Sequence, residues 1–141
     1  MIIASEVNLV VPNCQVSDLI SAGNYDFVDI IRGFSDYSLS AGEARAFLVQ
    51  FEYSDTSSVW RELSEEGLRP AMYHELLIFG ACHQNVTLEF CSSIPAFANP
   101  TGVEWYLRIL AIRFDMRGRG LISTPYHCSV GPSDRVLAVP K

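Results

Sequence analysis

The chain contains very little lysine and no long uninterrupted apolar run. Lys141 is the only lysine among 141 residues. The apolar run at 107–112 is interrupted by an arginine and is too short to span a bilayer. The first residues, Met1-Ile2-Ile3-Ala4-Ser5-Glu6, lack both the basic region and the continuous apolar region of a signal peptide. We therefore expect a cytoplasmic or virion-associated protein with no membrane partner.

The chain also lacks the cysteine spacing of a metal site or a redox motif. No Cys-x-x-Cys pair occurs, and no cysteine stands at zinc-ligand spacing from a histidine. In a reducing compartment the sequence predicts four free, mostly buried thiols, whereas two disulfides would fit an exported protein. We expect no metal and no other cofactor. The cysteines are Cys14, Cys82, Cys91 and Cys128.

No arrangement of nucleophile and base stands out in the sequence. His74 and Glu75 are adjacent, so on a helix their side chains point about 100° apart and do not form a paired site by themselves. Two adjacent pairs are formal candidates for a thiol nucleophile and its base: Cys82 with His83, and Cys128 with His127. Adjacent side chains rarely face each other, so a cysteine-dependent hydrolase is only the third alternative, and we expect no enzyme.

Charge divides the chain into two unequal parts. Residues 1–102 carry thirteen acidic residues against four arginines, a balance of -9. Residues 103–141 carry three acidic residues against five arginines and one lysine, a balance of +3. An acidic body with an arginine-bearing final third does not resemble a nucleic-acid-binding protein. Such a final third could present arginines to an anionic or carboxylate-rich partner.

Length and composition indicate one globular domain, residues 1–141. Hydrophobic residues make up 49% of the chain and charged residues 18%, far from the composition of a disordered protein. A chain of this length buries roughly two-thirds of its unfolded surface when it folds as one unit. We find no repeat, no low-complexity segment and no linker long enough to separate two domains.

The first half of the chain predicts three strands and one short helix. Residues 7–11 and the alternating stretch 25–31 are typical of strands, and residues 35–42 of a loop. Ser17 can cap a short helix that runs to residue 22, where a glycine follows. The third strand is predicted at 46–53. Its alternation places Val49, Phe51 and Tyr53 on one face and Gln50 and Glu52 on the other.

Two further helices are predicted in the centre. Several capping residues at 55–58 precede a helix over 59–66, which would bury Trp60 and Leu63 and end at Gly67. Pro70 suits the first turn of a second helix that runs to about residue 83. The apolar stripe of that helix is predicted to contain Met72, Leu76, Phe79 and Cys82.

The remaining residues are strand-like, with predicted strands at 93–97, 103–114, 121–124 and 135–139. Gly118 and Gly120 interrupt this region at Arg117-Gly118-Arg119-Gly120, which lacks the context of a phosphate loop. The motif is either a plain hairpin turn or a turn that projects its two arginines towards an anionic ligand. The fold class we predict is α+β, with two short helices packed on a small, mainly antiparallel sheet.

Three stretches of the chain carry a resemblance to a known family. They are Ala-Gly-Asn-Tyr-Asp-Phe-Val at 22–28, Gly-Leu-Arg-Pro-Ala followed by Glu-Leu-Leu-Ile-Phe-Gly-Ala within 67–81, and Asp-Arg-Val-Leu-Ala-Val-Pro-Lys at 134–141. The chain resembles small uncharacterised proteins of candidate-phylum bacteria and their mobile elements. Those proteins carry an AGKYDWV stretch, a GYRPATxxELLAFGA centre and an RFLAVRK end. The chain departs from the pattern at Met72, where the family has threonine, at the altered C-terminus, and across 103–133.

The order of elements is also similar to the C-type-lectin-like fold, in which two helices flank a small antiparallel sheet and late strands bind the ligand. Some proteins with that fold are variable targets of diversity-generating retroelements. This resemblance implies a ligand surface in the final third of the chain. Glu104, Asp115 and Asp134 are acidic residues of this region, but the Glu-Pro-Asn and Gln-Pro-Asp triplets of calcium-dependent sugar binding are absent.

Aromatic residues and arginines in the final third indicate a binding surface. Tyr106 shares a predicted strand face with Glu104 and Arg108, which favours exposure. Exposed aromatic side chains together with arginines are typical of protein-binding surfaces, although half-buried sheet residues would show the same pattern. We therefore expect non-enzymatic binding of a protein or peptide ligand, and not of nucleic acid. The predicted contact residues are Tyr106, Arg108, Arg113, Arg117, Arg119, Tyr126 and His127.

The main alternative is a self-assembling structural subunit of a virus or phage-like particle. A mean hydropathy of +0.18 is high for a monomer and favours some burial between copies of the chain. A homo-oligomer is therefore a second possible partner arrangement.

Overall fold

The computed structural model describes residues 1–29, 36–52, 55–84, 93–96, 108–125 and 134–141. Within these residues the chain forms helices α1 (Val16–Ala22), α2 (Thr56–Glu65) and α3 (Tyr73–Cys82). The strands in the first half are β1 (Ile2–Val11), β2 (Cys14–Gln15), β3 (Phe27–Asp29), β4 (Ser38–Leu39) and β5 (Gly42–Gln50). The later strands are β6 (Leu68–Pro70), β7 (Ser93–Ala96), β8 (Arg108–Asp115), β9 (Gly118–Pro125) and β10 (Val136–Pro140).

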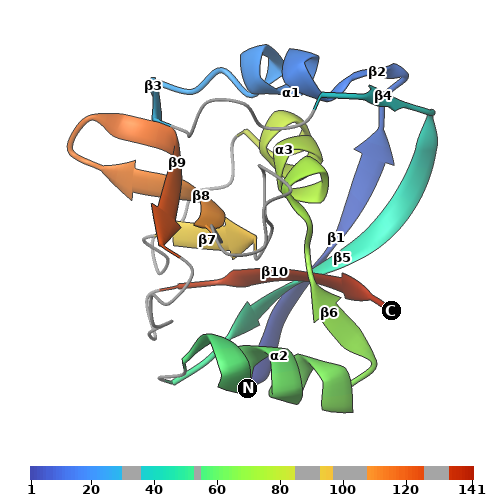
Figure 1. Cartoon of the computed structure of the whole chain (residues 1–141), viewed down its shortest axis with the longest axis vertical. Coiled ribbons are helices and arrows are strands. Elements are labelled where there is room, and N and C mark those ends of the chain that lie inside the picture. The colour runs from blue at the N-terminus through green and yellow to red at the C-terminus, as the bar shows by residue number, and fades with distance from the viewer. Residues whose placement is uncertain (30–35, 53–54, 85–92, 97–107, 126–133) are drawn as a thin grey trace.

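The strands form two four-stranded sheets and one two-stranded ladder (Figure 1). The first sheet has the order β1-β5-β10-β6 with antiparallel neighbours, and the second has the order β3-β9-β8-β7. In the second sheet β8 is antiparallel to β7 and β9, whereas β3 is parallel to β9. The ladder pairs β2 with β4. The fold of the described residues is therefore α+β with mainly antiparallel pairing, as the sequence predicts, but the prediction of a single small sheet is wrong, because the strands form two four-stranded sheets.

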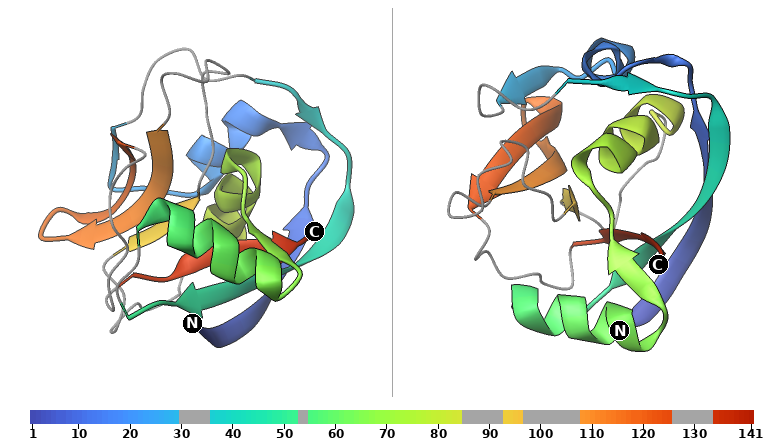
Figure 2. Two further views of the ribbon diagram at one scale, coloured as in Figure 1. Left: turned by 60° about the horizontal axis from the view of Figure 1, so that its bottom comes forward. Right: turned by 45° about the vertical axis from the view of Figure 1, so that its right-hand side comes forward.

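Helix α3 lies between the two four-stranded sheets and supplies the centre of the larger core (Figures 1 and 2). Its buried side chains include Leu76 and Phe79, which share one cluster with Leu137 of the first sheet and Leu121 of the second. Because α3 has apolar neighbours on several sides, almost every residue in its middle is apolar and buried. This helix therefore joins the two sheets into one packed unit.

Helix α2 covers the other face of the first sheet and forms a second, smaller core. Val59 and Leu63, four residues apart, are completely buried against Val49, Phe51 and neighbouring strand residues. The spacing of four places both side chains on one face of the helix. Asp55 caps the helix, since its carboxylate accepts a hydrogen bond from the Ser58 backbone N–H at 2.8 Å.

Several predicted elements are present with different bounds. The first strand starts at Ile2 and not at residue 7, because β1 pairs with β5 from Ile2–Gln50 to Val11–Gly42. The predicted loop at 35–42 contains β4 and the first residue of β5. Backbone pairing between distant segments, which the local sequence does not reveal, produces both differences. The α1 N-cap is Gln15 and not Ser17.

Four predictions for the two central helices are wrong, three about burial and one about where the second helix starts. Trp60 is 40% exposed, because Val59 and Leu63 define the buried face of α2 and Trp60 points about 100° from Val59. Pro70 lies in β6, since residues 68–70 pair with β10 before the chain enters α3. Met72 precedes the first turn of α3 and is 46% exposed, and Cys82 in its last turn is exposed as well.

Other predictions are confirmed in the described residues. Gly67 follows α2 with a φ of 73°, a left-handed conformation that favours glycine. Leu63, Leu76 and Phe79 are buried as predicted, and Val49 and Phe51, which the alternation places on one face, are both buried. Strands cover parts of all four stretches predicted after residue 92. Residues 30–31, Tyr53 and 103–107 of predicted strands lie outside the described part of the chain. No helix in the described part is long and apolar enough to cross a bilayer.

Candidate functional site

The β8–β9 hairpin carries most of the described residues that the sequence predicts as contacts. The two strands pair from Arg108–Pro125 to Asp115–Gly118, so the chain turns at Met116 and Arg117. Arg113 is exposed, and 65% of the Arg117 side chain is exposed. The Met116 side chain between them is fully exposed at the tip. The hairpin extends away from α3 and the first sheet (Figure 1).

Arg117 is oriented by contacts on both sides of the turn. Its Nη2 lies 3.1 Å from Asp115 Oδ2, and its backbone N–H donates to Asp115 Oδ1 at 2.7 Å. These bonds, helped by the charge of Arg113, hold the pKa of the Asp115 carboxyl below its usual value. The guanidinium carbon lies 3.9 Å from the centre of the Phe27 ring. Arg117 therefore presents a guanidinium that is partly ordered by an aromatic ring of β3.

Arg119 has a different role, because its guanidinium is used inside the fold. Nη1 donates to the backbone carbonyl of Gly23 at 2.6 Å, and Nη2 donates to that of Gly80 at 2.7 Å. Gly23 is the C-cap of α1, and Gly80 lies in the last turn of α3. A cation at a helix C-terminus satisfies unpaired carbonyls and interacts favourably with the helix dipole. Arg119 thus ties the ends of two helices to the hairpin.

The Tyr25 ring packs against the Arg119 guanidinium, close to the two helix ends. The Arg119 guanidinium carbon is 4.6 Å from the centre of the Tyr25 ring. Burial raises the pKa of Tyr25 to about 12, and the charge of Arg119 opposes that increase. A Cβ on Gly80 would lie 1.9 Å from the Tyr25 hydroxyl, so only glycine fits there without movement. The Ala-Gly-Asn-Tyr-Asp-Phe-Val stretch and the Phe-Gly-Ala stretch therefore meet in space.

The two glycines of Arg117-Gly118-Arg119-Gly120 are required by the approach of the same early segment. Asp26 Oδ2 accepts the Arg119 backbone N–H at 2.8 Å, and the Asp26 N–H donates to the Arg119 carbonyl at 2.8 Å. A Cβ on Gly118 would lie 2.2 Å from Asp26 Oδ2, and one on Gly120 would lie 2.0 Å from Phe27 Cζ. The motif is a hairpin turn with a docking surface for residues 26–27. The sequence contains no signal that pairs these two segments.

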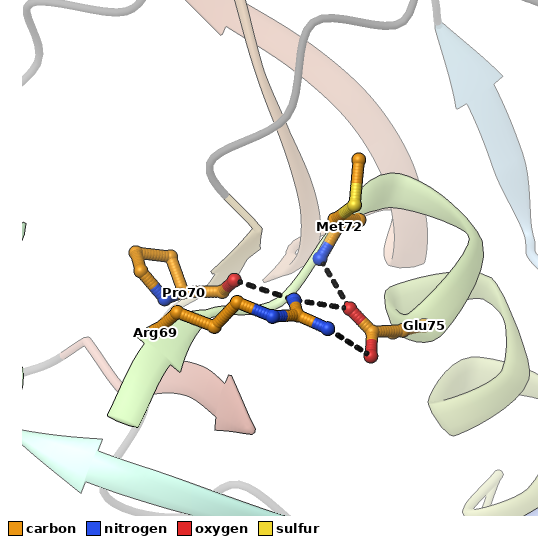
Figure 3. A network of polar contacts seen from close by, with 4 residues as sticks. All are labelled: Arg69, Pro70, Met72 and Glu75. Atoms are coloured by element: carbon orange, nitrogen blue, oxygen red, sulfur yellow. Dashed lines mark hydrogen bonds and ion pairs between the residues drawn. The ribbon is translucent and has the colours of Figure 1, made fainter. Parts of the chain in front are cut away.

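The central Arg-Pro-Ala-x-x-x-Glu stretch is organised by one carboxylate (Figure 3). Arg69 Nη1 and Nη2 donate to the two Glu75 oxygens at 2.8 and 3.1 Å. Glu75 Oε1 also accepts the Met72 backbone N–H at 2.8 Å, which satisfies one free donor at the start of α3. Arg69 Nη1 reaches the Pro70 carbonyl at 3.2 Å. The network fixes the angle between β6 and α3, so the stretch serves the architecture.

The cysteine–histidine pair at the end of α3 is turned towards β1. Cys82 Sγ lies 3.4 Å from the Val10 carbonyl oxygen, and His83 Nε2 lies 3.1 Å from that of Asn8. Cys14 and Cys82 are free thiols, and burial together with Asp18 raises the pKa of Cys14. Cys14 is half-buried and Cys82 exposed, which corrects the expectation of buried thiols for these two. Within the described segments no group of three or more potential metal ligands occurs.

Most of the other predicted contact residues lie outside the described part of the chain. Tyr106, Tyr126 and His127 lie outside the described residues, as do Cys91 and Cys128. Arg108 is the first residue of β8. Sequence reasoning missed Met116, although a methionine between Asp115 and the Arg-Gly turn stands at a natural hairpin tip.

Comparisons with protein-family models, with curated proteins and with solved structures find no match to this chain.

Proposed function

We propose that this chain is a non-enzymatic binding module that recognises a protein or peptide ligand through its C-terminal strand-and-loop surface. The observation that carries the proposal is the fully exposed Met116 side chain between exposed Arg113 and Arg117 at the hairpin tip. Methionine adapts its shape to varied apolar partners, and arginine forms directional bonds to carboxylates. An acidic segment with an apolar side chain is the ligand chemistry that suits this tip.

The neighbouring strand β3 extends the proposed contact surface. The Phe27 ring stacks against the Arg117 guanidinium, and Val28 of the same strand is exposed. Aromatic and arginine side chains are enriched in residues that dominate binding free energies. In the proposal Arg113, Met116 and Arg117 contact the ligand, and Arg119 positions the hairpin. Tyr106, Arg108, Tyr126 and His127 remain predicted contacts of the same surface.

The proposal can be tested by selecting displayed random peptides against the immobilised protein and measuring the affinity of the enriched peptides. We expect acidic peptides with one or two apolar residues. The double variant R113E/R117E should weaken their binding at least tenfold, and M116A should weaken it about threefold or more. R61E is the matched control, because Arg61 is exposed on α2. Equal binding by R113E/R117E and R61E would refute the proposed surface.

The family and the finer fold class are part of the proposal. Membership in the family with the GYRPATxxELLAFGA centre is supported by the roles of its motif residues, since Arg69 binds Glu75 and Gly80 gives room to Tyr25. A C-type-lectin-like arrangement is supported by the first sheet, which is antiparallel and is flanked by α2 and α3. An experimental structure of a family member that binds a known ligand would test both.

A second candidate function, a self-assembling subunit of a virus or phage-like particle, is favoured by the edge of β1. Ile2 and Ile3 are exposed there, at 65% and 47%. The other end of the same edge is covered, since α3 side chains reach the carbonyls of Asn8 and Val10. Light scattering behind a sizing column would detect assembly, and I2K/I3K should abolish it if this edge is used.

A further inference from the structure

Residues 36–39, which we call the latch segment, are tied to the start of α1 by exposed hydrogen bonds. Besides the two-residue β2–β4 ladder, the segment makes no other backbone strand pairing in the described residues. Such small, solvent-exposed units open at a much lower free energy than the core. The backbone N–H and the hydroxyl of Ser17 donate to the Asp36 carboxylate at 2.9 and 2.7 Å. The Val16 N–H donates to the Tyr37 carbonyl at 2.9 Å, and Gln15 Nε2 donates to Ser38 Oγ at 2.6 Å.

Tyr37 connects the latch segment to the first turn of α3. Its ring makes edge contacts with the rings of Tyr73 and His74, at centroid distances of 6.1 and 5.8 Å. Tyr73 and His74 contact each other at 6.0 Å, so the three rings form one cluster. Tyr73 is almost completely buried, whereas Tyr37 is 37% exposed. Tyr37, which also shares a side-chain hydrogen bond with Tyr73, is therefore the ring of this cluster that lies nearest to solvent.

His74 is the group of this cluster whose ordinary pKa lies nearest to neutral pH. Its Nδ1 atom is buried and has no hydrogen-bond partner among the described residues. Burial lowers the pKa of His74, the Glu75 carboxylate raises it and the Arg69 guanidinium lowers it. The Glu75 oxygens accept hydrogen bonds from Arg69 and from the Met72 N–H, and Glu75 acts on the imidazole through its charge. The rings of Tyr37 and Tyr73 make edge contacts with the imidazole, and the charge of Asp36 acts on Tyr73.

We propose that residues 36–39 form an acid-released latch, in which a proton on His74 detaches Tyr37 from α3 and opens the segment. The imidazolium carries an N–H at the buried Nδ1, which has no hydrogen-bond partner in the described part of the chain, and an unpaired buried donor is costly. Movement of Tyr37 into solvent gives water access to the imidazolium. The hydrogen bonds from Ser17 lower the pKa of Asp36, so the Asp36 carboxylate stays ionised while His74 gains its proton.

The pH dependence follows from the difference between the closed and open states. In the open state the imidazole is solvated and has a pKa near 6.5, whereas in the closed state its pKa is lower. The closed state is therefore fully favoured above pH 6.5 and is lost progressively as the pH falls below that value. Between pH 7.5 and 5.5 the opening equilibrium should increase by up to about tenfold, the limit that the solvated imidazole of the open state sets.

Amide hydrogen exchange measured by mass spectrometry tests the latch on the whole chain. After correction for the intrinsic pH dependence of exchange, protection of residues 36–40 should fall from pH 7.5 to 5.5, by up to about tenfold. Protection of the β5 segment 46–50 should not change. In His74→Phe, which keeps a neutral ring, the change in the latch segment should disappear. His83→Gln is the control histidine variant and should keep it.

Three results would overturn the latch. They are unchanged protection of residues 36–40, an equal change in His74→Phe, or parallel loss of protection in the β5 segment, which would indicate global unfolding. If His74→Phe does not fold, His74→Gln has the same expected result. As an independent measurement, the imidazole signals of His74 and the ring signals of Tyr37 should shift with one common midpoint below pH 6.5 in an NMR titration. Separate midpoints would also refute the latch.

Discussion

Replacement of Arg119 by alanine should destabilise the protein more than replacement of any exposed arginine of the hairpin. The change removes two charge-assisted hydrogen bonds, to the carbonyls of Gly23 and Gly80, and a ring contact with Tyr25. Bonds to charged groups contribute about 1.5–3 kcal/mol each, and partial exposure of Arg119 reduces that range. We expect a loss of about 3 kcal/mol in the free energy of unfolding.

Urea denaturation followed by circular dichroism measures this loss. With a slope of about 2 kcal/mol/M, a loss of about 3 kcal/mol lowers the midpoint by about 1.5 M. The urea midpoint of Arg119→Lys should lie between those of the unchanged protein and Arg119→Ala, because one ammonium group cannot reproduce the planar guanidinium that reaches both carbonyls. Arg113→Ala is the matched control and should change the free energy by less than about 0.5 kcal/mol, as expected for an exposed site. An Arg119→Ala midpoint equal to that of Arg113→Ala would refute the helix-tying role.

Three further predictions concern packing and titration. Gly120→Ala should lower the free energy of unfolding by at least about 2 kcal/mol, because the added methyl group overlaps the Phe27 ring. In a double-mutant cycle measured by urea denaturation, Gly120→Ala should lower it by much less in the background of Phe27→Ala. Leu63→Ala should lower the free energy of unfolding by about 3 kcal/mol, whereas Trp60→Ala should lower it by less than about 1 kcal/mol; similar losses would contradict the assigned burial. Because the folded-state pKa of Tyr25 is raised to about 12, its contribution to stability should be full below pH 10 and decline as the pH rises from 10 to 12. The pKa of Tyr73 is raised as well, so absorbance at 295 nm should show one late-titrating phenol fewer in Tyr25→Phe than in the unchanged protein, and an equal number would contradict the assignment.

The sequence predicts well those features that depend on local patterns. Asp55 as a cap, Gly67 as a helix stop and the alternation of Val49 and Phe51 each follow from short-range rules. The position of Trp60 could not be predicted as reliably. Two apolar residues in sequence, Val59 and Trp60, cannot both face the sheet, and only tertiary packing decides between them.

Pairing between distant segments is the part that the sequence did not reveal. Pro70 suits a helix start by local rules, but β10 pairs with residues 68–70 and keeps the proline in a strand. The contact of residues 25–27 with Arg119 and its flanking glycines joins positions more than ninety residues apart. For this reason Arg119 was predicted as a ligand contact from its residue type and its place in a turn. Its bonds to two helix ends are visible only in three dimensions.

NMR mapping of a bound ligand tests the central claim, that the hairpin tip is the binding surface, most directly. An acidic peptide enriched by selection would be titrated into ¹⁵N-labelled protein while the backbone amide spectrum is recorded. The largest shift changes are predicted at residues 27–28 and 113–117, with little change in α2 and in β1. Changes confined to α2 or β1, with the hairpin signals unmoved, would contradict the account.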